Sequence, residues 1–190
     1  MTGCAGLTRS GLVFACGVLL AAPALAGSSA GEPDGYRLGD YQSGTPLTVQ
    51  GRAALDTTAA RKLWETHAAA FIDVLSVPRR PDNLAPRAIW APVPRRDIPG
   101  SEWLPEVGRG ALTEPLETWF RLSLERISVG DKAASLVFYC RADCWMSWNA
   151  TKRALTWGYI GAQWYRDGSD GWEAAGLPLT EMKPPEEMPR

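Results

Sequence analysis

Apolar residues along this chain form short runs separated by stretches with helical spacing. Two runs, at 70–75 (AFIDVL) and 135–139 (SLVFY), predict strands buried on both faces of a sheet. Shorter strands are predicted at 46–49, at 88–90, after the turn at 98–101, and at 162–166 as the last strand. Helices are predicted over 57–68, 113–130 and 147–157, with a closing helical stretch at 173–175. This alternation predicts an α/β fold, a single domain with a central parallel sheet and helices on both faces.

Two polar features of these elements carry specific expectations. Asp73 interrupts the run at 70–75 and would be buried there, so it needs a partner. Thr57 and Thr58 precede the apolar positions of the first helix and are expected to cap its start.

The amino terminus has the pattern of a secretory signal peptide. Arg9 precedes an apolar centre at 11–22, and Ala24-Leu25-Ala26 resembles a cleavage site. The apolar centre is about 12 residues long, whereas a membrane-spanning helix needs about 20, so no stable membrane span is expected. The predicted organisation is a signal peptide at 1–26, an extended lead-in at 27–45, a domain at 46–180 and a flexible tail at 181–190.

Charge and histidine content narrow the classes of function. The chain has 20 basic and 21 acidic residues, a net charge of −1, which gives no reason to expect a nucleic-acid partner. His67 is the only histidine, which excludes histidine-rich metal sites. A cysteine–histidine catalytic dyad would require His67 to reach a cysteine.

The segment Cys140-Arg141-Ala142-Asp143-Cys144-Trp145 places two thiols on a loop between a predicted strand and a predicted helix. Cys4 and Cys16 would leave with the signal peptide, so these two remain as a pair. Such a loop directs backbone N–H groups into a shallow bowl at a helix amino terminus, where an anionic sulfur is favoured. With three residues between them the cysteines can also form a disulfide, and in an exported protein a purely structural bridge is one interpretation.

Four landmarks in register resemble a rhodanese domain from about Pro46 to Leu179. They are the early strand at 71–74 with its aspartate, the turn at 98–101, the strand at 136–140 that delivers a cysteine, and the segment at 168–179. More specifically, residues 139–149 resemble the exported, PQQ-dependent catabolism-associated CXXCW motif protein family. The resemblance implies a periplasmic location near quinoprotein dehydrogenases, and no cofactor bound to this chain.

By this resemblance Cys140 would accept and donate sulfane sulfur, and Cys144 would be the resolving cysteine that releases it and forms a disulfide. A six-residue loop is the length found in sulfur-handling members rather than in phosphatase-like ones. The implied partners are a small sulfur donor, a thiol acceptor, and a periplasmic PQQ-dependent dehydrogenase or cytochrome. The remaining residues expected to form the substrate and anion-binding loop are Arg141, Ala142, Asp143, Trp145 and Met146.

Two other functions remain open from the sequence. Asp143 stands where the family usually has glycine, and Trp145 where a basic residue often closes the loop, so the domain could be a catalytically silent accessory module. Alternatively, two thiolates at this spacing could hold Cu(I), although no methionine-rich tract accompanies them.

Overall fold

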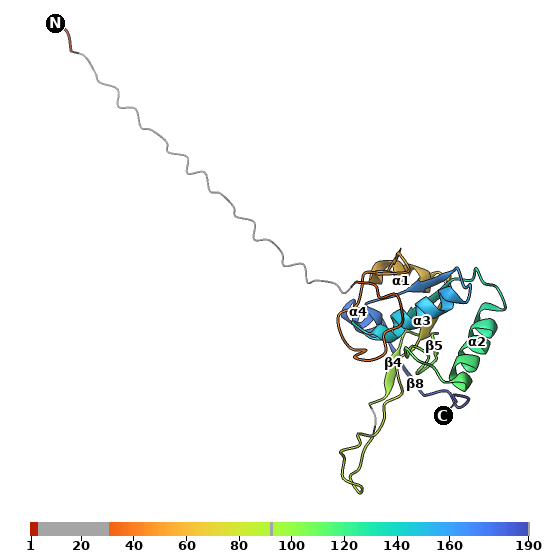
Figure 1. Cartoon of the computed structure of the whole chain (residues 1–190). Helices are drawn as coiled ribbons and strands as arrows, with labels where there is room; N and C mark the ends of the chain where they lie inside the picture. The colour runs from red at the N-terminus through yellow and green to blue at the C-terminus, as the bar shows by residue number, and fades with distance from the viewer. Residues whose placement is uncertain (4–30, 92, 190) are drawn as a thin grey trace.

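The computed structural model describes residues 1–3, 31–91 and 93–189 (Figure 1). The predicted signal peptide, with Cys4 and Cys16, therefore lies outside the described residues except for its first three. Within the described part of the chain, no helix is long and apolar enough to cross a membrane.

Four parallel strands form the central sheet, in the order β5-β3-β6-β7. β3 (Ala70–Asp73) and β6 (Leu136–Tyr139) are the two inner strands, and they correspond to the two apolar runs of the sequence. β5 (Glu102–Trp103) and β7 (Ala162–Trp164) form the edges. The prediction of a central parallel sheet is confirmed.

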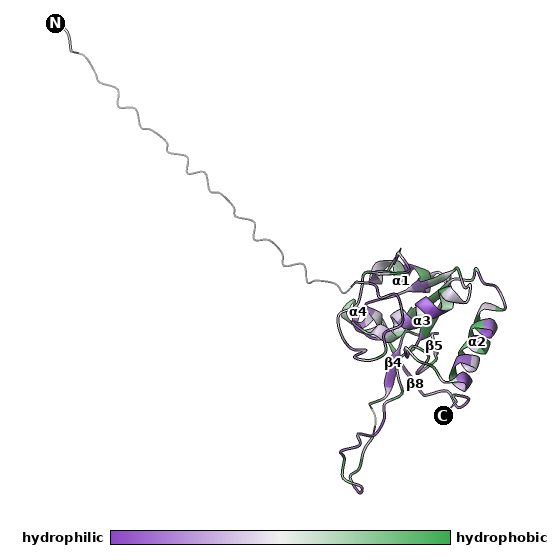
Figure 2. Cartoon of the chain, viewed as in Figure 1, coloured by the Kyte–Doolittle hydropathy of each residue, from purple (hydrophilic) through white to green (hydrophobic). Residues whose placement is uncertain are grey.

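Helices cover both faces of this sheet, as expected. One face carries Val137 of β6 and packs against α1 (Thr57–Glu65) and α4 (Gly168–Ala174). The other face carries Phe138 and packs against α2 (Glu114–Ser128) and α3 (Trp145–Thr156). Figure 2 shows hydrophobic and hydrophilic positions side by side on α2, which is the amphipathic pattern that the sequence predicted.

Two small antiparallel pairs lie outside the central sheet. β1 (Thr48–Val49) pairs with β2 (Arg52–Ala53), and β4 (Arg95–Asp97) pairs with β8 (Thr180–Met182). The chain between β3 and β4 projects from the body of the protein as a long arm (Figure 1). The strand predicted at 88–90 is wrong, since those residues belong to this arm and form no strand. The strand predicted at 162–166 is not the last one, because β8 follows it. β8 also extends past residue 180, where the sequence placed the end of the domain.

Local corrections concern helix starts. Asp56, and not a threonine, caps α1, because its side chain accepts a hydrogen bond from the N–H of Ala59 at 2.7 Å. α3 begins at Trp145, two residues before the predicted start, so Cys144 is its N-cap.

Helix α3 turns polar side chains inward as well as apolar ones. Asn149 Nδ2 donates to the carbonyl of Gly108 at 2.9 Å, and Arg153 donates to the carbonyls of Val107 and Gly110 at 3.1 and 2.9 Å. A Cβ at Gly108 would lie 2.3 Å from the carbonyl oxygen of Met146, so only glycine permits this close approach. The first turns of α3, which follow the thiol loop, are thereby fixed against the loop at 105–112.

Candidate active site at the thiol loop

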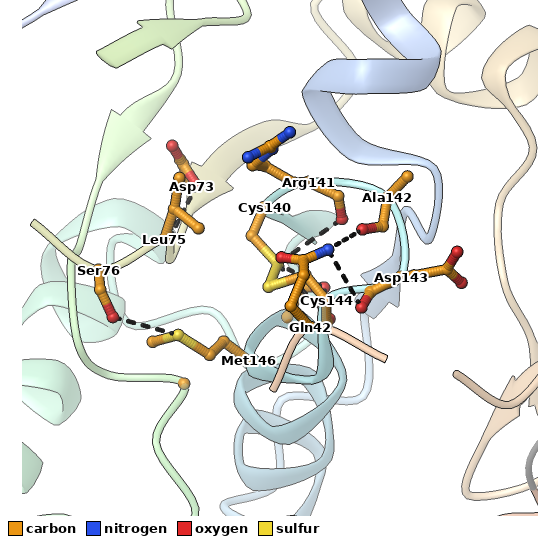
Figure 3. Close-up of a disulfide and its surroundings, with 12 residues drawn as sticks. Gln42, Asp73, Leu75, Ser76, Cys140, Arg141, Ala142, Asp143, Cys144 and Met146 are labelled. Atoms are coloured by element: carbon orange, nitrogen blue, oxygen red, sulfur yellow. Dashed lines mark hydrogen bonds between the residues drawn. A yellow bond between two sulfur atoms is a disulfide. The ribbon is translucent and has the colours of Figure 1, made fainter. Parts of the chain in front are cut away.

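The two cysteines form a disulfide between the end of β6 and the start of α3 (Figure 3). Their Cα atoms are 6.3 Å apart, within the range that a disulfide requires. Cys140 is fully buried and Cys144 is 2% exposed. The expected strand–loop–helix setting of the pair is confirmed.

The carbonyl of Cys140 is held by the start of α4. It accepts the N–H of Ser169 at 2.9 Å and the Ser169 hydroxyl at 3.1 Å, while Arg95 Nη2 lies 3.4 Å away. Gly168 has a φ of 54°, and a Cβ there would come within 2.5 Å of the same carbonyl oxygen. Glycine is therefore required at this position for α4 to support the thiol loop.

The lead-in passes directly over the loop. The N–H of Trp145 donates to the carbonyl of Tyr41 at 2.8 Å, and the N–H of Ser43 donates to the carbonyl of Asp143 at 3.0 Å. Gln42 adds a bond from Nε2 to the carbonyl of Ala142 at 2.6 Å (Figure 3), and it forms an isolated antiparallel bridge with Cys144. The extended lead-in is thus a cover for the disulfide.

Two N–H groups that were expected to line an anion-binding bowl already have partners within the protein. The N–H of Trp145 bonds to the lead-in, and the N–H of Ala142 donates to the Asp170 carboxylate at 3.3 Å. In the disulfide form, these two N–H groups are accordingly not free to bind an anion.

The charged side chains of the loop are paired with groups outside it. Arg141 lies 3.3 Å from Asp170, and Asp143 lies 3.2 Å from Arg166. Figure 3 shows the Asp143 carboxylate directed away from the sulfurs. Asp143 has a φ of 50°, which lies in the left-handed region of backbone conformation. Glycine adopts this region without strain, and aspartate is among the few other residues that adopt it readily.

Trp145 and Met146 lie in the core and not in an open loop. Trp145 packs edge-on against Trp148, with ring centroids 5.4 Å apart, and the Arg37 guanidinium lies 5.3 Å from its ring. Met146 Sδ accepts a hydrogen bond from the Ser76 hydroxyl at 3.3 Å, on the side away from Asp143 (Figure 3). Both residues support α3 instead of contacting a substrate in this form.

Sequence reasoning missed Ser147, whose hydroxyl contacts the sulfur of Cys140. Ser147 Oγ is 3.3 Å from Cys140 Sγ, and it donates to the carbonyl of Cys144 at 3.0 Å. Trp164 Nε1 donates to this hydroxyl at 3.0 Å. The only sequence hint was a serine one helical turn after the second cysteine, which is too common a feature to single out.

A buried charge cluster lies beneath the loop. Asp73 forms an ion pair with Arg95, which confirms that this aspartate has a partner, and Asp97 Oδ1 is 3.0 Å from Arg95 Nε. Burial and the neighbouring Asp73 raise the pKa of Asp97 to about 9. Burial, followed by the nearby carboxylates, also raises the pKa of Tyr139. Burial alone would lower the pKa of Arg95, but its pairing with Asp73 raises it.

A cavity of about 270 Å³ lies beside the loop, between the base of the arm and α4. Arg141 and Ser169 line it from the loop side, and neither cysteine reaches it. Across residues 1–3, 31–91 and 93–189 there is no cluster of three or more His, Cys, Asp or Glu side chains that could hold a metal ion.

No family model matches this chain, and no curated protein is significantly similar to it. Several solved structures are similar, among them two sulfurtransferases. A human single-domain sulfurtransferase is 22% identical, with a TM-score of 0.39, over 64% of this chain and 95% of that one. The homodimeric polysulfide-sulfur transferase of Wolinella succinogenes is 21% identical, with a TM-score of 0.42, over 70% of this chain and 80% of that one. Similarity at this level carries no information about the chemistry of the loop.

Proposed function

We propose that this protein is a rhodanese-like thiol protein that takes up sulfane sulfur on Cys140 and releases it with Cys144. The observation that carries the proposal is the Cys140–Cys144 disulfide at the junction of β6 and α3. A pair at the carboxyl end of a central strand, next to a helix amino terminus, has the setting in which thiolate chemistry is favoured.

The reaction has two steps. The Cys140 thiolate attacks a sulfane sulfur donor and becomes a persulfide, while the rest of the donor leaves with the electron pair of the broken bond. The Cys144 thiolate then attacks Cys140 Sγ, forms the disulfide and expels hydrosulfide. One sulfane sulfur is reduced to sulfide, and the two cysteines are oxidised. An external thiol then reduces the disulfide and completes the cycle.

In this proposal the disulfide form is the end of one turnover. The lead-in covers both sulfurs in this form, so the reducing thiol gains access when Tyr41–Ser43 separate from the loop. Arg141 and Asp143 are each paired with an oppositely charged side chain, so the loop is nearly neutral. A donor such as polysulfide is therefore not attracted by the charge of the loop, and it reacts by direct attack of the thiolate.

The cellular setting is part of the same proposal. The signal-peptide pattern at 1–26 and the resemblance to the exported CXXCW family support a periplasmic location. That family's association with PQQ-dependent alcohol catabolism supports a quinoprotein dehydrogenase or a cytochrome as partner. Cell fractionation with an antibody against the mature chain tests the location; recovery of an uncleaved chain in the cytoplasm contradicts it.

Intact mass spectrometry tests the chemistry. The mature protein is reduced, freed of reductant and incubated with polysulfide, as wild type, Cys140→Ser and Cys144→Ser. We expect Cys144→Ser to gain about 32 Da, one sulfur, and wild type to lose about 2 Da while releasing one equivalent of sulfide. Cys140→Ser gains no sulfur. Wild type that remains unchanged, with no sulfide released, contradicts the proposal and favours the silent accessory module.

A further inference from the structure

A buried serine hydroxyl lies within hydrogen-bonding distance of the Cys140 sulfur. Ser147, in the first turn of α3, has its oxygen 3.3 Å from Cys140 Sγ and 3.0 Å from the carbonyl of Cys144. Trp164 Nε1, at the end of β7, donates to the same oxygen at 3.0 Å. Ser147 is fully buried and Trp164 is 1% exposed, so water does not compete for these contacts.

The hydroxyl has one hydrogen to donate. In the disulfide form it goes to the carbonyl of Cys144, because a bonded sulfur is a weak acceptor and carries no charge. When Cys140 becomes a thiolate, rotation about the Cβ–Oγ bond redirects the same hydrogen to Sγ without moving the oxygen. The Trp164 N–H keeps the oxygen in place during this rotation, and its own hydrogen bond polarises the hydroxyl.

We propose that Ser147, positioned by Trp164, stabilises the thiolate of Cys140 in the two steps in which that sulfur is charged, the attack on the donor and the reduction of the disulfide. Ser147 touches the reacting sulfur, whereas Trp164 acts through Ser147 and is a positioning residue. The inference rests on the proposed function for its role, but the hydrogen bond itself is independent of which sulfur donor is used.

The hydrogen bond determines which sulfur leaves when the disulfide is reduced. A thiolate attacks Sγ of Cys144, a new S–S bond forms there, and the Cys140–Cys144 bond breaks with its electron pair on Cys140 Sγ. Ser147 then donates to that thiolate. Attack on Cys140 instead would leave the charge on Cys144, whose side chain accepts no capping hydrogen bond from α3 within the described structure. Charge-assisted hydrogen bonds are about twice as strong as neutral ones, so attack on Cys144, which leaves the charge on Cys140, is favoured.

Other polar groups near Cys140 do not substitute for this hydroxyl. The remaining polar atoms recorded beside its sulfur, within the described residues, are the carbonyl oxygens of Arg141 at 3.9 Å and Cys144 at 3.5 Å, and these accept but do not donate. The charged groups on the surrounding elements are already paired with one another. These pairs are Arg141 with Asp170, Arg166 with Asp143, and Arg95 with Asp73 and Asp97.

The test measures ionisation of Cys140 directly. In a Cys144→Ser background, the ultraviolet absorbance of the thiolate is followed from about pH 5 to about pH 10, with the Cys140→Ser, Cys144→Ser double variant as blank. Adding Ser147→Ala is expected to lower the thiolate fraction about tenfold at pH values below the midpoint. Adding Ser147→Thr, which keeps a hydroxyl, restores it. The matched control is Ser123→Ala, which removes a buried helical hydroxyl from α2.

Each outcome bears on the proposal. Superimposable titrations for the parent and the Ser147→Ala variant overturn it. If Ser147→Ala fails to fold, Trp164→Phe provides a second test. Loss of the indole N–H should also lower the thiolate fraction of Cys140, by a smaller amount. The titration needs no sulfur donor, so it separates the two proposals. Sulfur uptake on Cys140 with no Ser147 effect leaves the proposed function standing and removes only this inference.

Discussion

Asp97 is the residue whose surroundings conflict most with its charge. Its side chain is fully buried, and neither carboxylate oxygen has a hydrogen-bond partner. Arg95 Nε lies 3.0 Å away, but its single hydrogen is directed at Asp73. Two buried carboxylates thus share one guanidinium, and protonation of Asp97 relieves the repulsion between them.

Replacement of Asp97 should change how stability depends on pH. The pKa of Asp97 is about 9 in the folded protein against an ordinary value of 3.8, so between these values the folded form holds a proton that the unfolded chain has released. The free energy of unfolding therefore falls as the pH rises through this window. Asp97→Asn removes this dependence, so its free energy of unfolding should rise relative to that of wild type between about pH 4 and pH 9, by at most about 1.4 kcal/mol for each pH unit.

Urea unfolding at several pH values measures this difference. Asp82→Asn, an exposed aspartate on the arm, is the matched control and should run parallel to wild type. Parallel curves for wild type and Asp97→Asn would show that Asp97 is ionised in the folded protein.

At the residue scale, the sequence identified the groups whose chemistry is visible in the residue type. The two cysteines and the buried Asp73 could be found in this way, because a thiol pair and a charge within an apolar run are unusual. Ser147 and Asp97 could not. A serine in a helix and an aspartate after two arginines are ordinary in sequence. Their roles come from burial and from their surroundings, which are Trp164 for Ser147 and the ion pair of Arg95 with Asp73 for Asp97.

At the scale of elements, the lead-in crosses the thiol loop as an extended segment, joined to it by an isolated antiparallel bridge between Gln42 and Cys144. Its contacts to the loop are made by backbone groups of Tyr41 and Ser43 and by one side chain, Gln42. The Tyr41 ring also packs against the hydrophobic core, and Asn149 binds the backbone of Arg37, so opening of the lead-in over the sulfurs is a local separation between anchored residues.

A proline in the lead-in should expose the disulfide. Ser43→Pro removes the N–H that donates to Asp143, so we expect reduction by dithiothreitol to become several-fold faster. Ser43→Ala retains that N–H and loses only the hydrogen bond from the Ser43 hydroxyl to the carbonyl of Asp40. It should therefore be reduced at the same rate as wild type. Timed acid quench, alkylation and mass spectrometry give the rate. Equal rates for all three proteins would mean that the reductant reaches the sulfurs by another course.

The sequence predicted the elements that have strong internal patterns. β3, β6, α2 and α3 are long or apolar enough for periodicity to reveal them. The pairing of β4 with β8 could not be predicted, because β4 is Arg-Arg-Asp and its partner lies more than 80 residues away. Short strands of this type are fixed by tertiary contacts, here by the burial of Arg95 and Asp97.

At the scale of the whole molecule, the site is assembled from most of the chain. The lead-in, β3, β4, the thiol loop, β7 and α4 each supply a group within one or two contacts of the sulfurs. The parallel sheet brings the carboxyl ends of β3 and β6 to the same edge, which is why Asp73 and Cys140 are neighbours despite their separation in sequence.

Loss of the disulfide should leave this assembly folded. A bridge between residues four apart restricts the unfolded chain little, and the expected contribution is about 2 kcal/mol. Reduced wild type and the variant with both Cys140→Ser and Cys144→Ser should therefore melt roughly 4 to 8 °C below the oxidised protein. Differential scanning calorimetry measures the shift. A fall of more than about 15 °C would indicate a bridge that holds the fold together, and would weigh against a redox role.

The contact between Trp164 and Ser147 gives the protein an internal spectroscopic probe. The indole proton of Trp164 points at an oxygen whose own hydrogen changes partner when the disulfide opens. Although the chain contains nine tryptophans, each indole proton gives a separate resonance in a nitrogen-15 correlation spectrum. That of Trp164 should shift with the oxidation state of the cysteine pair, so the progress of a turnover can be read without any label on the sulfurs.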